Sequence, residues 1–115
     1  MALSRDDILR AADCRPEAVE TPEWGGRVWI RPITAAERDR FEMRFHAAEG
    51  AGRYENLRAA LVAMALSDEE GRRLLTDEDA AALGAKSAAV LDRLFDVAKH
   101  LAGIGPAEAQ DLEKN

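Results

Sequence analysis

The longest unbroken apolar run of the chain, eight residues over 59–66, is the feature that most constrains its fold. The apolar character begins at Leu57 and only Arg58 interrupts it. A helix that is apolar on every side usually lies at the centre of a domain or at a protein interface. Eight residues are too few to span a bilayer, which takes about 20. We therefore expect a helix over residues 54–66 at the centre of the core, with an interface as the alternative.

Alanine dominates the apolar residues that could surround this segment. Of the 54 apolar residues 23 are alanine, and Val, Ile, Leu and Phe together number only 24 of 115. Ala and Leu have the highest helix propensities, and a chain of this length usually forms one domain. The sequence predicts a mainly α (α+β) fold, a compact bundle of about five to six short helices with one small N-terminal β-hairpin. We expect a single domain over residues 1–115, with 104–115 as a loosely attached C-terminal helix or tail.

Capping patterns predict where several helices begin. Ser4 and Thr34 each precede an acidic residue three positions on, Asp7 and Glu37. In this capping box the hydroxyl accepts the N–H of the third helical residue, and its carboxylate accepts the N–H of the cap. Helices are therefore expected from residues 5 and 35, and a similar cap predicts a short helix over 76–84. Apolar residues at helical spacing predict a longer amphipathic helix over 87–103, namely Leu91, Leu94, Ala98 and Leu101.

The hairpin is predicted around Gly25-Gly26, because two glycines suit a tight turn between strands over 17–24 and 27–33. With the glycines as the two turn residues, Trp24 pairs with Arg27. Alternation along the strands then divides the hairpin into two faces. One face is aliphatic, with Val19, Thr21, Val28 and Ile30, and is expected to face the core. The other carries Trp24, Arg27, Trp29 and Arg31, beside Glu20.

The face with both tryptophans is the candidate protein-binding site, made of Trp24, Arg27, Trp29 and Arg31. Trp and Arg are enriched among the residues that dominate binding energy at interfaces, and Arg can stack on Trp. The alternative is that the N-terminal helix folds over this face and buries the tryptophans, because an open aromatic patch promotes aggregation. In either case Leu3, Ile8 and Ala11-Ala12 are expected to lie against the body of the protein. The sequence leaves both readings open.

Catalytic and metal chemistry is not indicated by the remaining polar residues. His46 and His100 lie on charged helix faces, and the single cysteine, Cys14, can form no internal disulfide. The formal net charge of −6 argues against non-specific nucleic-acid binding, which depends on neutralising phosphates. Arg5 and the acids beside it argue against a signal peptide. We expect a cytoplasmic protein that is not an enzyme, binds no cofactor or metal, and contacts neither nucleic acid nor membrane.

A family resemblance extends this interpretation over nearly the whole chain. In order, the sequence contains Glu23-Trp-Gly-Gly26, Thr34-Ala-Ala-Glu-Arg-Asp39 with Phe41, Asn56-Leu-Arg58, Asp68-Glu-Glu-Gly71 with Thr76-Asp-Glu-Asp79, Leu83-Gly-Ala-Lys-Ser87 with Leu91-Asp-Arg-Leu-Phe95, and Glu113-Lys-Asn115. Together these strings resemble the tail assembly chaperones of long-tailed bacteriophages and prophages.

The resemblance implies a non-enzymatic, mainly helical protein that acts in the cytoplasm of the bacterial host. Such proteins bind the long tape measure protein, help tail tube protein assemble around it, and are absent from the finished virion. The family is also known for a programmed translational frameshift that yields a longer form. Homo-oligomers are plausible, since many copies must coat one client. The alternatives are a small bacterial adaptor or regulator with another partner, an enzyme or metal protein, and a structural virion protein.

Overall fold

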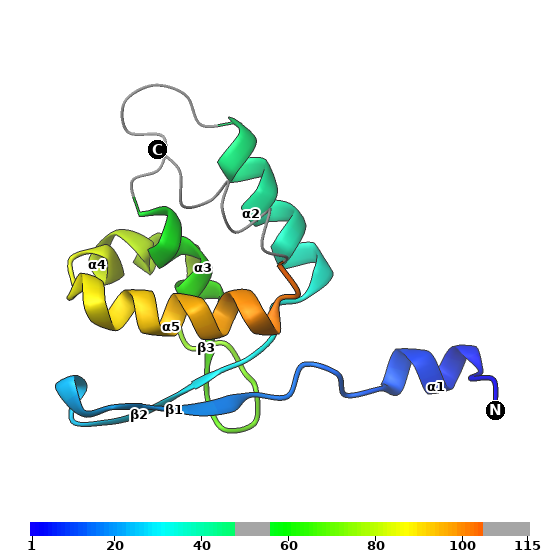
Figure 1. The fold of residues 1–115 in the computed structure, drawn as a ribbon. Coiled ribbons are helices and arrows are strands. Elements are labelled where there is room, and N and C mark those ends of the chain that lie inside the picture. The colour runs from blue at the N-terminus through cyan, green and yellow to red at the C-terminus, as the bar shows by residue number, and fades with distance from the viewer. Residues whose placement is uncertain (48–55, 105–115) are drawn as a thin grey trace.

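The computed structural model describes residues 1–47 and 56–104. Figure 1 shows helices gathered on one side of a small sheet, with a short N-terminal helix set apart from both. The elements in chain order are α1 (Arg5–Arg10), β1 (Glu17–Thr21), the 3-10 turn η1 (Pro22–Trp24), β2 (Gly26–Ile30), α2 (Ala35–Ala47), α3 (Leu57–Ala65), β3 (Leu66–Ser67), the 3-10 turn η2 (Asp77–Asp79), α4 (Ala80–Gly84) and α5 (Ala88–Leu101). The mainly α class with a small antiparallel sheet is confirmed. Most of the predicted tail, 105–115, lies outside the described residues.

Helix α3 is the centre of the core, as its composition predicted. Every residue of α3 except Arg58 is buried, and α3 packs against α2, α4 and α5. Leu61 and Val62 have no exposed surface at all, and full burial of such a side chain contributes about 1.5–3 kcal/mol. The amphipathic helix α5 packs against α3, and its residues Leu94 and Phe95 are also buried.

The hairpin differs from the predicted two-glycine turn. Glu20 pairs with Arg27 and Ala18 pairs with Trp29, so the expected pairing of Trp24 with Arg27 is wrong. The chain leaves β1 at Pro22, which has no N–H for the ladder and is suited to the first position of the 3-10 turn. Gly25 then takes a left-handed conformation with φ of 83°, and Gly26 already belongs to β2.

A third strand, which the sequence analysis did not predict, comes directly after α3. The helix ends at Ala65, and Leu66 and Ser67 pair antiparallel with Ile30 and Trp29 of β2. The sheet order is therefore β1-β2-β3. The expectation that Leu66 is helical is wrong, because this apolar residue satisfies its backbone in the sheet and remains buried there.

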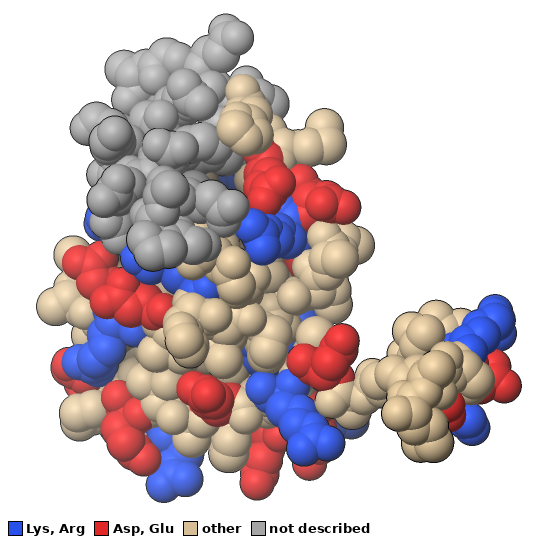
Figure 2. Space-filling model, turned by 45° about the vertical axis from the view of Figure 1, so that its right-hand side comes forward, with Lys and Arg blue, Asp and Glu red and all other residues tan. Residues whose placement is uncertain are grey.

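Helix α1 does not lie against the body, contrary to expectation. It has no buried residue, and Leu3, Ile8 and Leu9 are 62%, 58% and 67% exposed. Figures 1 and 2 show α1 as a separate lobe beyond the start of β1, joined to the body by a thin segment. The predicted capping box is present, with Asp7 N–H donating to Ser4 Oγ at 3.2 Å and Ser4 N–H to Asp7 Oδ2 at 3.0 Å.

Candidate functional site

Arg31, one of the four residues of the predicted face, is buried and only 5% exposed. Its Nη2 donates to Glu37 Oε2 at 2.7 Å and to the carbonyl of Met64 at 2.8 Å. Its backbone N–H donates to the carbonyl of Ala65 at 2.9 Å. Arg31 therefore joins the end of β2 to α2 and to the end of α3, and its side chain does not share a solvent-facing surface with the tryptophans.

Glu37 is the acidic partner in this buried pair and also completes the capping box of α2. Its Oε1 accepts the N–H of Thr34 at 2.8 Å, and its own N–H donates to Thr34 Oγ1 at 3.1 Å. Burial alone would raise the pKa of Glu37, but the hydrogen bonds from Arg31 and Thr34 outweigh burial and lower it below the ordinary value. The lowered pKa favours the carboxylate form of Glu37, which pairs with Arg31.

Arg27 and Trp29 lie on the hairpin face that the alternation predicted. Arg27 is exposed and approaches Glu20 across the strands, with Nη2 3.3 Å from Glu20 Oε1. Trp29 is half-buried. The adjacent Val28 points to the opposite side, because successive side chains of a strand alternate. Arg27 is exposed and Trp29 is partly exposed, and α1 lies beyond the start of β1, away from the hairpin tip (Figure 1).

Trp24 lies on the other side of the hairpin, because the 3-10 turn displaces it from the strand alternation. It is 37% exposed. Together with Val28 it lines an open apolar groove of about 450 Å³, which is completed by Leu66, Leu74, Leu75, Leu83 and Lys86. We call this feature the Trp24 groove. The sequence reading that placed both tryptophans on one face is therefore corrected.

A bidentate ion pair fixes the tip of the hairpin beside α5. Arg93 Nη1 lies 2.9 Å from Glu23 Oε2, and Arg93 Nη2 lies 2.7 Å from Glu23 Oε1. These hydrogen bonds lower the pKa of Glu23 from 4.5 to about 2. The same Arg93 Nη2 reaches the carbonyl of Glu20 at 3.5 Å. The position of Trp24, next to Glu23 in the turn, thus depends on a contact 70 residues away in sequence.

Reactive groups do not converge in the described part of the chain. Within residues 1–47 and 56–104, no group of three or more His, Cys, Asp or Glu side chains could hold a metal ion. Burial raises the pKa of the Cys14 thiol and the neighbouring Asp13 carboxylate raises it further, so the reactive thiolate is disfavoured. No helix in the same residues is long and apolar enough to cross a membrane.

The sequence analysis missed two apolar surfaces that the fold leaves open. One is the row of leucines in the Trp24 groove, of which Leu74 is 61% exposed. The other is the apolar surface of α1, formed by Leu3, Ile8 and Leu9. Two pairs of apolar residues in the sequence could have indicated these surfaces. They are Leu74-Leu75, in a short segment between polar turns, and Ile8-Leu9, on a helix that is followed by a linker. Neither signal distinguishes a covered from an uncovered surface without the tertiary structure.

Comparison with known proteins identifies one family. A family model described as phage tail assembly chaperone matches residues 7–115. No curated protein matches the chain, and no solved structure does. The match covers both the helical core and the hairpin with the candidate residues.

Proposed function

The chain belongs to the phage tail assembly chaperone family, and from that membership we propose that it binds the tape measure protein and promotes tail tube assembly. The proposed place of action is the cytoplasm of the bacterial host. In this proposal the protein assists assembly and does not remain in the mature virion. The family match over residues 7–115 is the observation that carries the proposal.

The surface that we propose for the client is the hairpin face with Arg27 and Trp29. Arg27 is exposed and Trp29 is partly exposed, and both Arg and Trp are enriched among interface hot spots. Trp24 contributes from the other side of the hairpin, at the Trp24 groove. Arg31 takes part indirectly, because its buried contacts with Glu37 and Met64 hold the end of β2 in place.

The charge of the chain fits a chaperone for a long, partly apolar client. Figure 2 shows acidic and basic side chains interspersed over the visible face, without a large patch of one sign. A net charge of −6 favours solubility of the chain and of a complex that it coats. A catalytic centre is not required for this role, and the proposal includes no enzymatic activity.

The test is co-expression of this chain with the tape measure protein encoded in the same phage or prophage. We expect a soluble complex that survives affinity capture and sizing, in place of an aggregated tape measure protein. Arg27→Ala and Trp29→Ala should weaken capture, whereas Met43→Ala, at an exposed apolar residue on α2, is the matched control. If neither this chain nor a longer frameshifted form keeps the tape measure protein soluble, the proposal is wrong.

Two other roles give different results in the same experiment. A small bacterial adaptor or regulator would capture another host protein and leave the tape measure protein insoluble. A structural virion protein would remain in purified particles. The proposed chaperone should be abundant in the lysate during assembly and absent from purified particles, and mass spectrometry of both fractions checks this.

A further inference from the structure

We infer that the Trp24 groove receives an amphipathic helical segment of the tape measure protein, and that a carboxylate of this segment lies beside Lys86. The inference rests on the proposed function, because it takes the tape measure protein as the client. It adds the chemistry by which the client is recognised, namely apolar side chains at helical spacing next to an Asp or Glu. Three features carry it: the apolar groove, a polar hollow that adjoins the groove, and the unpaired charge of Lys86.

The Trp24 groove supplies the apolar half of the contact. Six of its seven lining residues are apolar or aromatic, and Trp24 and Leu74 are 37% and 61% exposed. Its volume of about 450 Å³ accommodates several aliphatic side chains, since whole small-molecule pockets measure about 300–1,000 Å³. An amphipathic helix that presents apolar residues three and four positions apart fits a groove of this kind.

An extended strand is a poorer occupant, because the sheet edge beside the groove is closed. The carbonyl of Leu66 in β3 accepts the N–H of Leu74 at 3.1 Å, and the next residue, Ser67, forms a β-bridge with Arg73. The backbone groups to which an added strand would bind are therefore already used. A helix needs no backbone groups from the groove, because its own are satisfied internally.

A polar hollow of about 200 Å³ adjoins the groove at Lys86, which lines both. We call it the Lys86 hollow. Its wall includes Leu57, Arg58 and Ala59 at the start of α3 and Ala88 at the start of α5. The N-terminal end of a helix carries a partial positive charge. The hollow therefore combines two such ends with the ammonium group of Lys86, and this combination attracts a carboxylate.

Neither helix end is capped by a side chain in the described part of the chain. The first helical hydrogen bonds run from the N–H of Ala60 to the carbonyl of Asn56 at 2.8 Å and from the N–H of Leu91 to the carbonyl of Ser87 at 3.0 Å. The N–H groups before them have no acceptor within their own helix, and neither Asn56 nor Ser87 provides a side-chain cap. The Asn56 side chain instead lies against Gly84, where a Cβ would leave it no room. These N–H groups are donors that an acidic partner can use.

The charges around the two surfaces leave Lys86 unpaired. Lys86 is exposed, and within residues 1–47 and 56–104 it forms no ion pair. Two carboxylates at neighbouring positions already have partners: Asp92 Oδ1 lies 3.3 Å from Arg58 Nη1, and Glu23 Oε1 lies 2.7 Å from Arg93 Nη2. An acid from outside the chain is therefore needed to complement Lys86.

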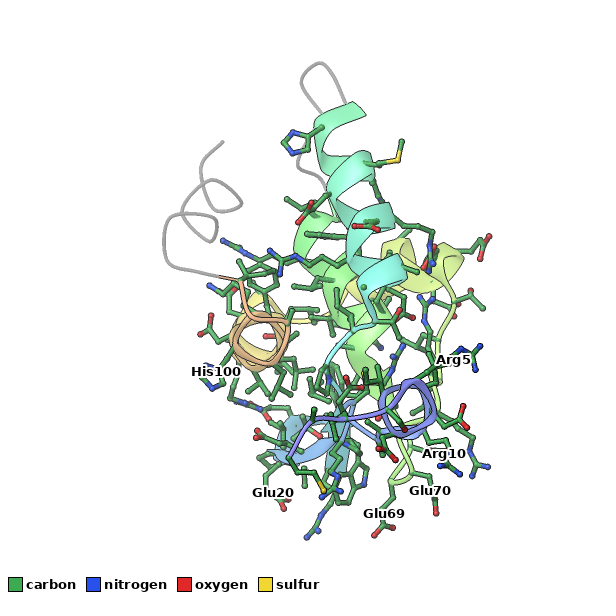
Figure 3. All side chains as sticks on the ribbon, turned by 90° about the vertical axis from the view of Figure 1, so that its right-hand side faces the viewer. Arg5, Arg10, Glu20, Glu69, Glu70 and His100 are labelled. Carbon is green, nitrogen blue, oxygen red and sulfur yellow. The ribbon has the colours of Figure 1, made fainter. Side chains whose placement is uncertain are left out.

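The acidic turn that leads to Leu74 does not compensate Lys86. Figure 3 shows Glu69 and Glu70 pointing away from the helices, and Glu70 Oε2 lies 3.5 Å from Arg72 Nη2. Opposite charges at the rim of an apolar contact promote association and orient the partners. The unpaired lysine thus favours a client segment with an Asp or Glu beside its apolar residues.

Segments of the chain itself fit this description less well. Helix α1 is neutral, with two arginines and two aspartates, and lies at the other end of the sheet from the hairpin tip in Figure 1. Residues 105–115 include three acids but only one large apolar residue, Leu112, which is too little for a groove of about 450 Å³. A partner segment with several apolar residues and an acid is the occupant that both surfaces fit.

The experiment measures the binding of overlapping synthetic peptides of the tape measure protein from the same phage or prophage to the full chain, by fluorescence anisotropy. Leu74→Asp disables the groove, and Lys86→Glu reverses the charge of the Lys86 hollow. Both residues are exposed, so circular dichroism and thermal melts should show unchanged folding. Met43→Asp and Arg44→Glu, at exposed residues of α2, are the matched controls. Arg44→Glu changes the net charge by the same amount as Lys86→Glu.

We expect the tightest peptides to contain apolar residues at helical spacing beside an Asp or Glu. Leu74→Asp and Lys86→Glu should each weaken their binding at least tenfold, and both controls should bind as the wild type does. A peptide in which Lys replaces that acid should bind the wild type at least tenfold more weakly and recover its affinity on Lys86→Glu. This reciprocal effect distinguishes a direct contact with Lys86 from a structural role.

Four outcomes would overturn the inference and leave the proposed chaperone function intact. They are peptide binding that either variant leaves unchanged, an equal loss in Arg44→Glu, a charge-reversed peptide that gains nothing on Lys86→Glu, and no bound peptide although the chain keeps the full-length tape measure protein soluble. A chain that neither binds the peptides nor keeps the tape measure protein soluble would refute the proposed function, and the inference with it.

Discussion

Removal of Arg31 should be among the most destabilising single substitutions in the chain. Its guanidinium is buried and pairs with Glu37 at 2.7 Å and with the Met64 carbonyl at 2.8 Å. Breaking a buried pair by removing one partner costs about 3–5 kcal/mol, because the other charge remains buried. Arg73 Nη1, 4.0 Å from Glu37, offers partial compensation and favours the lower end of that range. The expected loss is a large part of the total stability of such a domain, about 5–15 kcal/mol.

The assay is a double-mutant cycle measured by urea unfolding, with Arg31→Met, Glu37→Gln and both together. Gln can keep the capping box of α2, so the cycle isolates the charge pair. We expect Arg31→Met to lower the free energy of unfolding in urea by about 3–5 kcal/mol. In a thermal melt this corresponds to a melting temperature lower by about 12–20 °C, at about 4 °C per kcal/mol. The double variant should cost no more than the worse single variant, which gives a coupling energy of about 2 kcal/mol or more.

The exposed Arg27–Glu20 pair is the control for this cycle. The side chains of Arg27 and Glu20 are 58% and 70% exposed. Exposed ion pairs contribute about 1 kcal/mol at most to the free energy of unfolding. A coupling energy for Arg31 and Glu37 no larger than that of the control would refute the argument that burial makes the first pair structurally necessary.

Three further predictions follow from the same contacts. The free energy of unfolding should fall as the pH drops below about 4.5, because the pKa of Glu37 is lower in the folded than in the unfolded chain, so that the unfolded chain binds more protons. Urea titrations at several pH values measure this loss, and it should be smaller in Glu37→Gln. Arg93→Ala removes the bidentate contact with Glu23 and should speed amide hydrogen exchange in β1 and β2 while the core helices stay protected. Leu94→Ala should cost about 2–5 kcal/mol in urea unfolding because it leaves a cavity in the core, and Leu74→Ala, at a residue 61% exposed, should change stability by less than about 0.5 kcal/mol. Equal losses for the two leucine variants would contradict the burial assigned to each.

The helices were predictable because their signals are local. The capping boxes at Ser4 and Thr34 are both formed. Of the four residues that the apolar spacing of α5 indicated, Leu91, Leu94 and Ala98 are buried and Leu101 is half-buried. The uniform apolarity of α3 was sufficient to place it at the centre. Each of these signals lies within a single helix or its cap, so the sequence alone contains the necessary information.

The candidate site was harder to predict because its geometry depends on distant contacts. One residue, Pro22, converts the two-glycine turn into a 3-10 turn and moves Trp24 to the opposite side of the hairpin. The burial of Arg31 depends on Met64, 33 residues away. An alternation rule assigns faces only while the strand continues. The predicted strands, 17–24 and 27–33, included Trp24 and Arg31, but the observed strands end before both residues, at Thr21 and Ile30.

The core of the described residues forms without a contribution from α1. Helix α3 buries its apolar surface against α2, α4 and α5, and β3 completes the sheet beside β2. Leu3, Ile8 and Leu9 are not part of this core and remain more than half exposed. Arg27 and Leu74 are exposed and lie outside the buried core, so variants at these two residues should separate binding from folding. A chain whose surface variants all lowered the melting temperature in proportion to lost binding would show that this separation is wrong.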